Sequence, residues 1–236
     1  MRLAGFLLFA LIISQVCAFT DYSFSLKTIF DADGGSHVVQ KTVLFLDSDS
    51  DRSTFDFYFN RAQFTLLEWQ KFSKTLKFYY NGTTSNLTII AAREPNLGYN
   101  AVSVSLEYDV LGLLSREQEG PRSTLYHFDS LRSVLTNENG DLSLGSGVEF
   151  TLVLPDGSRL VKAIPEPTVK EGSLLRWKGP LKGTFALSFE YEKPLSQEIN
   201  EFFQELQRDV GNFYVLALLL AFVAFIGFKF INSRRD

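Results

Sequence analysis

Cysteine and histidine are almost absent from this sequence of 236 residues. The only cysteine is Cys17, and the only histidines are His37 and His127. If Cys17 leaves with an N-terminal signal, the remaining chain has no disulfide, no thiol nucleophile and no cysteine metal ligand. Neither histidine stands in a recognisable zinc-ligand pattern, and no nucleophile elbow, phosphate loop or His-Glu-x-x-His motif is present. We therefore expect a protein that is not an enzyme and has no cofactor.

The sequence also lacks an excess of basic residues. Its 23 Lys and Arg face 27 Asp and Glu, which gives a formal net charge of −4 at pH 7. Three of the cations, Lys229, Arg234 and Arg235, lie at the C-terminal end, so the rest of the chain is more acidic still. This charge argues against nucleic acid or an anionic membrane surface as the ligand.

Long apolar runs occur only near the two ends of the sequence. Near the N-terminus, Arg2 precedes the apolar run 6–13, and Val16 and Ala18 are small residues at the positions that a signal peptidase reads. This pattern predicts a signal peptide over residues 1–18. An uncleaved membrane anchor is the alternative, although the run is short for a span of about 20 residues.

The second apolar run, residues 213–231, is long enough to cross a bilayer and contains one charge, Lys229, near its end. Arg234 and Arg235 follow it. The positive-inside rule therefore predicts a single-pass protein of the cell membrane, with the N-terminus outside and a cytoplasmic tail over residues 232–236.

Between these runs, apolar and polar residues alternate with a period of two. The pattern occurs in "STFDFYFN" (53–60), "AVSVSLEY" (101–108) and "GVEFTLVL" (147–154), and turn residues separate the segments. We expect each of them to be a β-strand. Asn81-Gly82 lies between two further apolar segments and predicts a tight hairpin, because both residues tolerate positive φ.

One strand pattern occurs twice. "SVSLEYDV" (103–110) resembles "ALSFEYEK" (186–193), and each follows an Ala-x-x-Glu-Pro segment, at 91–95 and at 163–167. An apolar strand precedes both segments. Chance similarity of two strands is one reading, because alternation with tyrosine is common in strands. Internal duplication is the other.

We adopt the duplication and predict a mainly β fold with two tandem β-sandwich (Ig-like) domains, residues 19–110 and 111–194. Leu106 and its counterpart in the second copy would face the cores. Glu107 and Glu190 would face outward, and we expect no catalytic role for them, because no base, metal or nucleophile accompanies them.

Residues 195–212 differ from the rest, because their apolar residues recur at helical spacing. We expect a juxtamembrane amphipathic helix that begins near Ser196 and leads to the transmembrane helix. Its apolar stripe could pack on its own domain, pair with a second copy or contact a membrane protein. The residues of the stripe are Ile199, Phe202, Phe203, Leu206 and Val210.

An acidic turn supplies the best metal candidate. Asp47, Asp49 and Asp51 stand at alternate positions, as the ligands of a calcium loop do. The EF-hand pattern fails, however, where Arg52 replaces the glycine and Tyr58 replaces the bidentate glutamate. A solvated acidic loop is the simpler interpretation, and calcium remains a weak candidate.

Two N-glycosylation sequons follow in the chain. They are Asn81-Gly82-Thr83 and Asn86-Leu87-Thr88, and both would lie at the tip of the predicted hairpin. Exposed sequons agree with an exported protein.

The segments "VLPDGSRL" (153–160) and "LLRWKGPLKG" (174–183), with the terminal signals and the cysteine-free β region, are similar in layout to archaeal-type single-pass cell-surface membrane proteins. The resemblance implies a β-sandwich ectodomain on a membrane anchor. We therefore expect a non-enzymatic surface glycoprotein whose ectodomain binds another component or gives structural support. The alternative is an accessory subunit of a membrane enzyme, a glycan-transfer complex or a transport complex.

Overall fold

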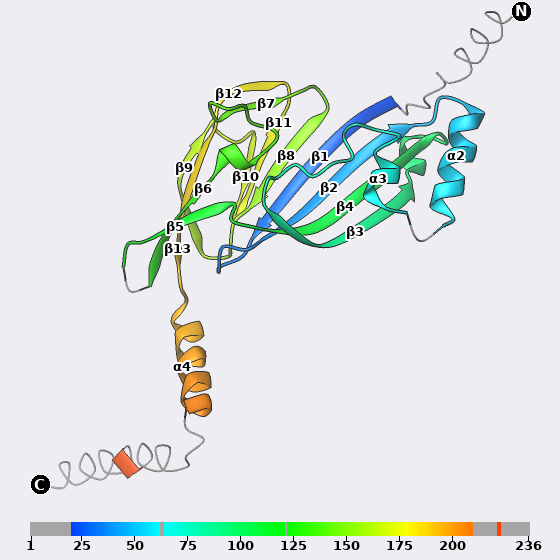
Figure 1. Cartoon of the computed structure of the whole chain (residues 1–236). Coiled ribbons are helices and arrows are strands. Elements are labelled where there is room, and N and C mark those ends of the chain that lie inside the picture. The colour runs from blue at the N-terminus through cyan, green and yellow to red at the C-terminus, as the bar shows by residue number, and fades with distance from the viewer. Residues whose placement is uncertain (1–19, 62–63, 121, 210–220, 223–236) are drawn as a thin grey trace, which may run out of the picture. The chain divides into compact units, whose positions relative to one another are not determined.

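The computed structural model describes residues 20–61, 64–120, 122–209 and 221–222 (Figure 1). The predicted signal peptide, nearly all of the predicted span and the predicted tail lie outside these residues. Within them, no helix has both the length and the apolar character that a membrane crossing requires. The chain divides into two units, Met1–Tyr191 and Glu192–Asp236.

The first unit is mainly β, as predicted, and its described strands form several sheets. Of the α-helices labelled in Figure 1, α2 and α3 lie in the first unit and α4 lies in the second. The elements are β1 (Thr20–Phe30), β2 (Ser36–Phe45), α2 (Asp49–Phe59), α3 (Leu66–Trp69), β3 (Thr83–Arg93), η1 (Pro95–Leu97), β4 (Ala101–Leu111), β5 (Leu114–Gln118), β6 (Ser123–Phe128), η2 (Ser130–Arg132), β7 (Asp141–Leu144), β8 (Val148–Val153), β9 (Ser158–Ile164), β10 (Val169–Glu171), β11 (Leu174–Lys178), β12 (Leu181–Thr184), β13 (Ala186–Glu192) and α4 (Leu195–Asp209).

The largest sheet has seven strands in the order β10-β11-β8-β1-β2-β4-β3, and a four-stranded sheet has the order β5-β6-β13-β9. Strand β1 pairs in parallel with β8, from Phe24 opposite Val148 to Ile29 opposite Val153. This pairing corrects the predicted boundary between residues 110 and 111. The two tandem sandwiches are not formed, because backbone hydrogen bonds join both predicted halves in one sheet.

The repeated strand pattern nevertheless has a local structural counterpart. Strand β4 contains the first copy and pairs antiparallel with β3, while β13 contains the second copy and pairs antiparallel with β9. In each case this partner strand is an edge strand and the repeated pattern lies one strand inward. Leu106 and Phe189 are both fully buried, as predicted. The two copies therefore have similar local pairing but belong to different sheets.

One face of the seven-stranded sheet, here called the inner face, carries the apolar core. The register places Leu26, Gln40, Leu106 and Ile89 in one row across β1, β2, β4 and β3. A large buried cluster joins this face to the four-stranded sheet, where Phe189 contributes its side chain. A smaller buried cluster lies towards the other end of the same face, beneath α2 and α3.

The irregular segment between Gln70 and Asn81 runs over the inner face from the smaller cluster to the larger one. The amide of Gln40 donates to the Thr75 carbonyl at 3.2 Å, and the hydroxyls of Thr28 and Tyr80 lie 2.6 Å apart. Burial raises the pKa of Tyr80 well above its ordinary value, so its hydroxyl stays protonated and can donate. These contacts satisfy polar groups that would otherwise be costly to bury.

Residues 53–59 are helical and Asn60 caps the helix, which corrects the strand that their alternation predicted. Helix α2 begins after Ser48, whose hydroxyl accepts from the Asp51 backbone N–H while the Asp51 carboxylate accepts from the Ser48 backbone N–H. This capping box satisfies two backbone donors at the helix start. Phe55 is buried, whereas Phe57 and Phe59 are exposed, so the three do not share one buried face.

The hairpin predicted at Asn81-Gly82 is also wrong. Tyr80 forms an isolated bridge with Ser133, and the Asn81 backbone N–H donates to the Arg132 carbonyl at 2.7 Å. Strand β3 begins only at Thr83. The residues before the turn are therefore held by a segment distant in sequence and not by a partner strand across the turn.

Candidate functional site

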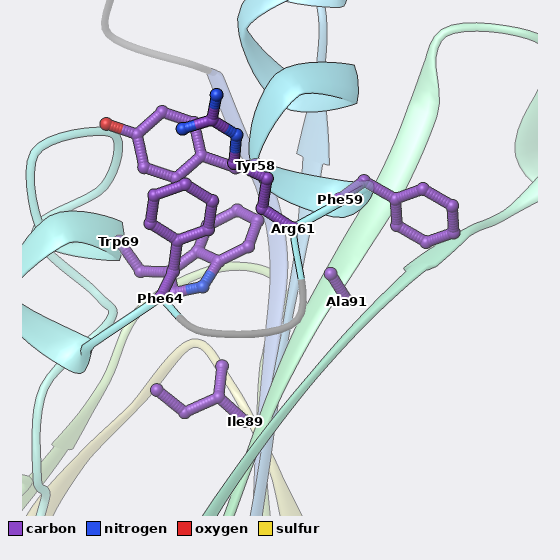
Figure 2. A pocket seen from close by; sticks show the side chains of 7 residues that line it. All are labelled: Tyr58, Phe59, Arg61, Phe64, Trp69, Ile89 and Ala91. Atoms are coloured by element: carbon purple, nitrogen blue, oxygen red, sulfur yellow. The ribbon is translucent and has the colours of Figure 1, made fainter.

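A pocket of about 120 Å³ lies where α2 and α3 meet the edge of the large sheet (Figure 2). Helices α2 and α3, with Arg61 and Phe64 between them in the chain, supply one wall, and strand β3 supplies the other. Figure 2 shows the rings of Tyr58, Phe64 and Trp69 grouped together, with Ile89 and Ala91 coming from β3. We call this the aromatic pocket; its lining residues are Tyr58, Phe59, Arg61, Phe64, Trp69, Ile89 and Ala91.

The aromatic wall is held by ring contacts. The centroid of the Tyr58 ring lies 4.1 Å from that of Phe64, 5.6 Å from that of Trp69 and 4.7 Å from that of Phe72. Beneath them, the buried ring of Phe55 lies 6.0 Å from Trp69. Such contacts between large side chains with few rotatable bonds fix the shape of the wall before any ligand binds.

The opposite wall comes from alternate positions of β3. Ile89 and Ala91 are two residues apart, so their side chains point to the same face, which is the inner face. Ala91 lies opposite the fully buried Val104. Its small side chain adds little bulk to this wall of the pocket.

Arg61 supplies the positive charge of the pocket. Its guanidinium carbon lies 4.1 Å from the centroid of the exposed Phe57 ring, a cation–π contact. Among the described residues, no carboxylate forms an ion pair with it. The neighbouring acids are engaged elsewhere, because Asp56 pairs with Arg93 and Glu68 accepts from Thr65.

The hydrogen bonds from the Thr65 backbone N–H and hydroxyl lower the pKa of Glu68, so this carboxylate stays ionised and bound to its helix start. It keeps its negative charge, and among the described residues it forms no ion pair with Arg61. Within the described part of the chain, neither the Tyr58 hydroxyl nor the Trp69 indole nitrogen makes a hydrogen bond. The pocket thus offers stacking surfaces, apolar contact and cationic donors, which are groups suited to binding.

Sequence reasoning missed this pocket, although a signal for it was present. Ser48-x-x-Asp51 and Thr65-x-x-Glu68 both match the capping-box pattern that marks the start of a helix. Applied to residues 48–69, that pattern predicts two helices and places Phe55 and Phe59 one turn apart. Their rings are stacked with centroids 5.7 Å apart.

The three calcium candidates lie at the start of α2. Asp51 accepts from the Ser48 hydroxyl at 2.7 Å, Asp49 pairs with Arg52, and Asp47 accepts from the Thr20 hydroxyl. Each carboxylate therefore has a donor from the protein. In the part of the chain that the structure describes, no three Asp, Glu, His or Cys side chains are grouped closely enough to hold a metal ion.

Both sequon asparagines are exposed, although not at a hairpin tip. Asn86 lies at a β-bulge in β3 and has a φ of 55°, which is uncommon for a residue with a side chain. Its amide nitrogen, the atom that a glycan would modify, donates to Asp109 at 2.7 Å, and Asp109 contacts His37 at 2.8 Å. Attachment of sugar stays a prediction.

The structure separates the two repeated glutamates. Glu190 accepts hydrogen bonds from the Ser123 hydroxyl at 2.5 Å and from the Arg159 guanidinium at 2.6 Å, and these bonds lower its pKa. Glu107 lies on β4 in the other sheet, facing away from the inner face. The second histidine, His127, is exposed on β6.

The amphipathic helix predicted over residues 195–212 is observed as α4, over Leu195–Asp209. Ile199, Phe202 and Phe203 are between 47% and 56% exposed. The side chains of Leu206 and Val210 lie outside the described residues. The helix belongs to the second unit, and its Glu201 forms an ion pair with Lys193, which precedes the helix.

Comparison with protein-family models and with curated proteins found no match. Among solved structures, the chain is similar to the folded domain of LppM from Mycobacterium tuberculosis, determined by NMR. The identity is 10%, the match covers 75% of this chain and 94% of that one, and the TM-score is 0.36. At this level of similarity we draw no functional argument from it, and the archaeal-type resemblance remains a prediction.

Proposed function

We propose that this protein is a non-enzymatic binding protein that holds an apolar group, with a negative charge beside it, in the aromatic pocket. One observation supports the proposal above all others: rings that form a fixed wall stand beside the Arg61 guanidinium, which no described carboxylate neutralises. An aromatic wall favours flat or apolar groups, and an unpaired guanidinium favours carboxylate or phosphate. The ligand class is therefore amphiphilic and anionic.

The size of the pocket limits the part of the ligand that enters it. A volume of about 120 Å³ is smaller than the roughly 150 Å³ apolar cavity that accepts benzene in another protein. One ring or one branched aliphatic side chain is therefore the largest group that we expect to be enclosed, and the rest of the ligand would remain outside.

We propose, further, that the protein is exported and anchored by a single pass, so that the pocket faces the exterior. The predicted signal peptide, the apolar run 213–231 and the cations after it support this arrangement. Protease added to intact cells should digest a tag placed after Ala18 and spare one placed after Asp236. The reverse pattern would contradict the orientation.

The ligand proposal can be tested with two small probes. The full-length protein in detergent would be titrated with 3-phenylpropionate and with the uncharged 3-phenylpropanol, with tryptophan fluorescence as the signal. We expect the carboxylate to bind about tenfold more tightly, the ratio that one charge-assisted hydrogen bond produces. Arg61→Gln should abolish that preference, and Ala91→Leu should abolish binding of both probes by filling the pocket.

The control is Arg116→Gln, which removes an exposed arginine from β5 in the other sheet. It should leave both affinities unchanged. If neither probe changes the fluorescence at millimolar concentration, or if Arg61→Gln and Arg116→Gln behave alike, the proposal fails.

A second candidate function has support from α4. Its exposed apolar side chains and the apolar run that follows at 213–231 favour an accessory subunit that binds a membrane protein through this helix. Phe202→Gln with Phe203→Gln should then release the protein from a complex isolated in mild detergent, while Gln204→Ala should not. A complex that survives the double substitution would exclude this role.

A further inference from the structure

Strand β3 is an edge strand, and one half of it is less protected than the other. It ends the order of the seven-stranded sheet, and in Figure 1 no other strand lies along its outer side. Its first half contains the bulge between Ser85 and Thr88, and both sequons lie at or just before this half. Bulges and bulky modifications discourage pairing with other chains. The second half, Thr88–Arg93, has a regular register with β4 and contains neither a bulge nor a sequon asparagine; its one charge, Arg93, pairs with Asp56 of α2.

The unprotected half of β3 is also the half that forms the aromatic pocket. Ile89 and Ala91 line the pocket on the inner face, and Ile90, between them, points to the other face and is 45% exposed. A backbone that pairs with β3 would lie about 4.8 Å away from it. Every second side chain of such a backbone would then point to the face on which the aromatic wall stands.

We propose that the partner is a protein segment in extended conformation, which pairs with Thr88–Arg93 of β3 as an additional strand. One apolar side chain of the segment enters the aromatic pocket, and an acidic side chain two residues away contacts the Arg61 guanidinium. In this mode of recognition, main-chain hydrogen bonds supply affinity and pockets for alternate side chains supply specificity. The inference rests on the proposed function, because the same pocket receives the apolar group.

The charges near the pocket select the sign of the partner. Arg61 lacks an acidic partner within the described residues, and the carboxylates of Asp56 and Glu68 already accept from Arg93 and Thr65. The exposed Lys71 follows α3, but the ionised Glu68 close to it offsets its charge, so Arg61 is the cation on which this argument depends. An acidic segment would therefore be attracted, although the chain as a whole carries net negative charge.

The experiment uses the full-length protein in detergent and a defined peptide, acetyl-Thr-Asp-Thr-Phe-Thr-Asp-Thr-amide. Its phenylalanine and both aspartates share one face of a strand, so it can bind in either direction. A series of peptides would carry one N-methyl group at each successive backbone amide. Because strand pairing uses only alternate amides of the added strand, methylation should weaken binding by about tenfold at every second position and leave the others within about twofold.

Hydrogen–deuterium exchange supplies an independent measurement. The peptide should slow the exchange of amides within Thr88–Arg93. It should leave amide exchange unchanged in β9, an edge strand of the four-stranded sheet. Ala91→Leu should remove both the binding and the protection. Arg116→Gln, the matched control, should change neither.

The outcomes separate this inference from the proposed function. If 3-phenylpropionate binds and depends on Arg61 while N-methylation shows no alternation, the pocket binds small groups and the strand pairing is refuted. If neither the acid nor the peptide binds, both proposals fail. If the protein dimerises without peptide and β3 amides are protected in the dimer, a second copy occupies the edge and the partner proposed here is wrong.

Discussion

Two tryptophans lie in the core over the inner face of the large sheet, Trp177 on strand β11 and Trp69 on helix α3, and their surroundings differ. Trp177, beneath the four-stranded sheet, has no exposed surface; its ring stacks on Phe150 and its indole N–H donates to the Pro165 carbonyl at 2.8 Å. Trp69, beneath the helices, is 3% exposed and makes no hydrogen bond within the described residues. Both residues fill a core, but of the two only Trp177 donates its indole N–H to another described residue.

The difference follows from what covers each end of the sheet. Two sheets packed face to face bring continuous rows of side chains together, which interdigitate and leave little free volume. At the other end the cover consists of α2 and the four-residue helix α3. Two short helices do not cover a twisted sheet as far as its edge strand, so a space remains between Tyr58, Phe64 and Ile89.

The largest expected effect on stability comes from substitutions that add side-chain atoms at the two ends of the sheet. A Cβ placed on Gly179, at the sheet-covered end, would lie 1.8 Å from the Gly145 carbonyl oxygen. We expect Gly179→Ala to lower the free energy of unfolding by about 3 kcal/mol, because backbone must move. Ala91→Leu adds more atoms at the helix-covered end and should cost less than about 1 kcal/mol, because the pocket accepts them.

Urea denaturation of Gly179→Ala and Ala91→Leu would measure the free energy of unfolding that each substitution costs. Equal losses, or a greater loss for Ala91→Leu, would show that the two ends are packed alike and would contradict the comparison.

The two tryptophans provide the next test. Trp177→Phe leaves the partly buried Pro165 carbonyl without its donor and leaves a void in the core, so we expect a loss of about 2 kcal/mol. Trp69→Phe removes no hydrogen bond and should cost about 1 kcal/mol. The difference in urea midpoint between the variants is the measurement. A larger loss for Trp69→Phe would place the better-packed core under the helices.

A smaller effect concerns the start of α2. Ser48→Ala removes the hydroxyl that accepts from the Asp51 backbone N–H and should lower the free energy of unfolding by about 1 kcal/mol. Because α2 carries Tyr58, the same variant should also weaken binding of 3-phenylpropionate. Ser50→Ala, in the first turn of the same helix, is the control. If Ser48→Ala and Ser50→Ala lose the same stability, the Ser48 cap does not stabilise the start of α2.

The smallest effects concern pH. The pKa values of Glu68 on α3 and of Glu190 on β13 are lowered by their hydrogen bonds, so each contributes stability above its unfolded-state pKa. That contribution is lost as the pH falls through the lowered folded-state pKa. Glu68→Gln and Glu190→Gln should therefore be slightly less stable than the unmodified protein at pH 7, and the difference should shrink as the pH falls below the ordinary pKa of Glu.

Thermal melts across this pH range would detect the convergence. Because both carboxylates are near solvent, the differences should be small at each end of the molecule. If the difference in stability between each variant and the unmodified protein grows as the pH falls, the ionised carboxylates are not the stabilising forms.

Strand identity could be read from the sequence where one face of a strand is buried along its whole length. Val102, Val104 and Leu106 alternate with polar residues, and the structure buries all three in β4. The same rule failed at residues 53–60, because a period of two also places Phe55 and Phe59 one helical turn apart. Local capping by Ser48 decided between the two conformations.

The candidate site was less accessible to such reasoning. Its aromatic residues come from one segment, but Ile89 and Ala91 come from a strand at least twenty positions away. The unpaired state of Arg61 depends on which partners the acids Asp56 and Glu68 find in space. No sequence interval predicts those choices, since each is a competition among several nearby cations and backbone donors.

The sequence by itself determined the mainly β character, the amphipathic helix at residues 195–209 and the exposure of both sequons, because these properties depend on local periodicity and composition. Only the tertiary structure decided that β1 pairs with β8 and that the repeated strands belong to different sheets. Strand pairing is a contact between distant segments, and the apolar surface that it buries is known only when both segments are placed together. For the same physical reason, the pocket beside β3 was visible only in the folded chain.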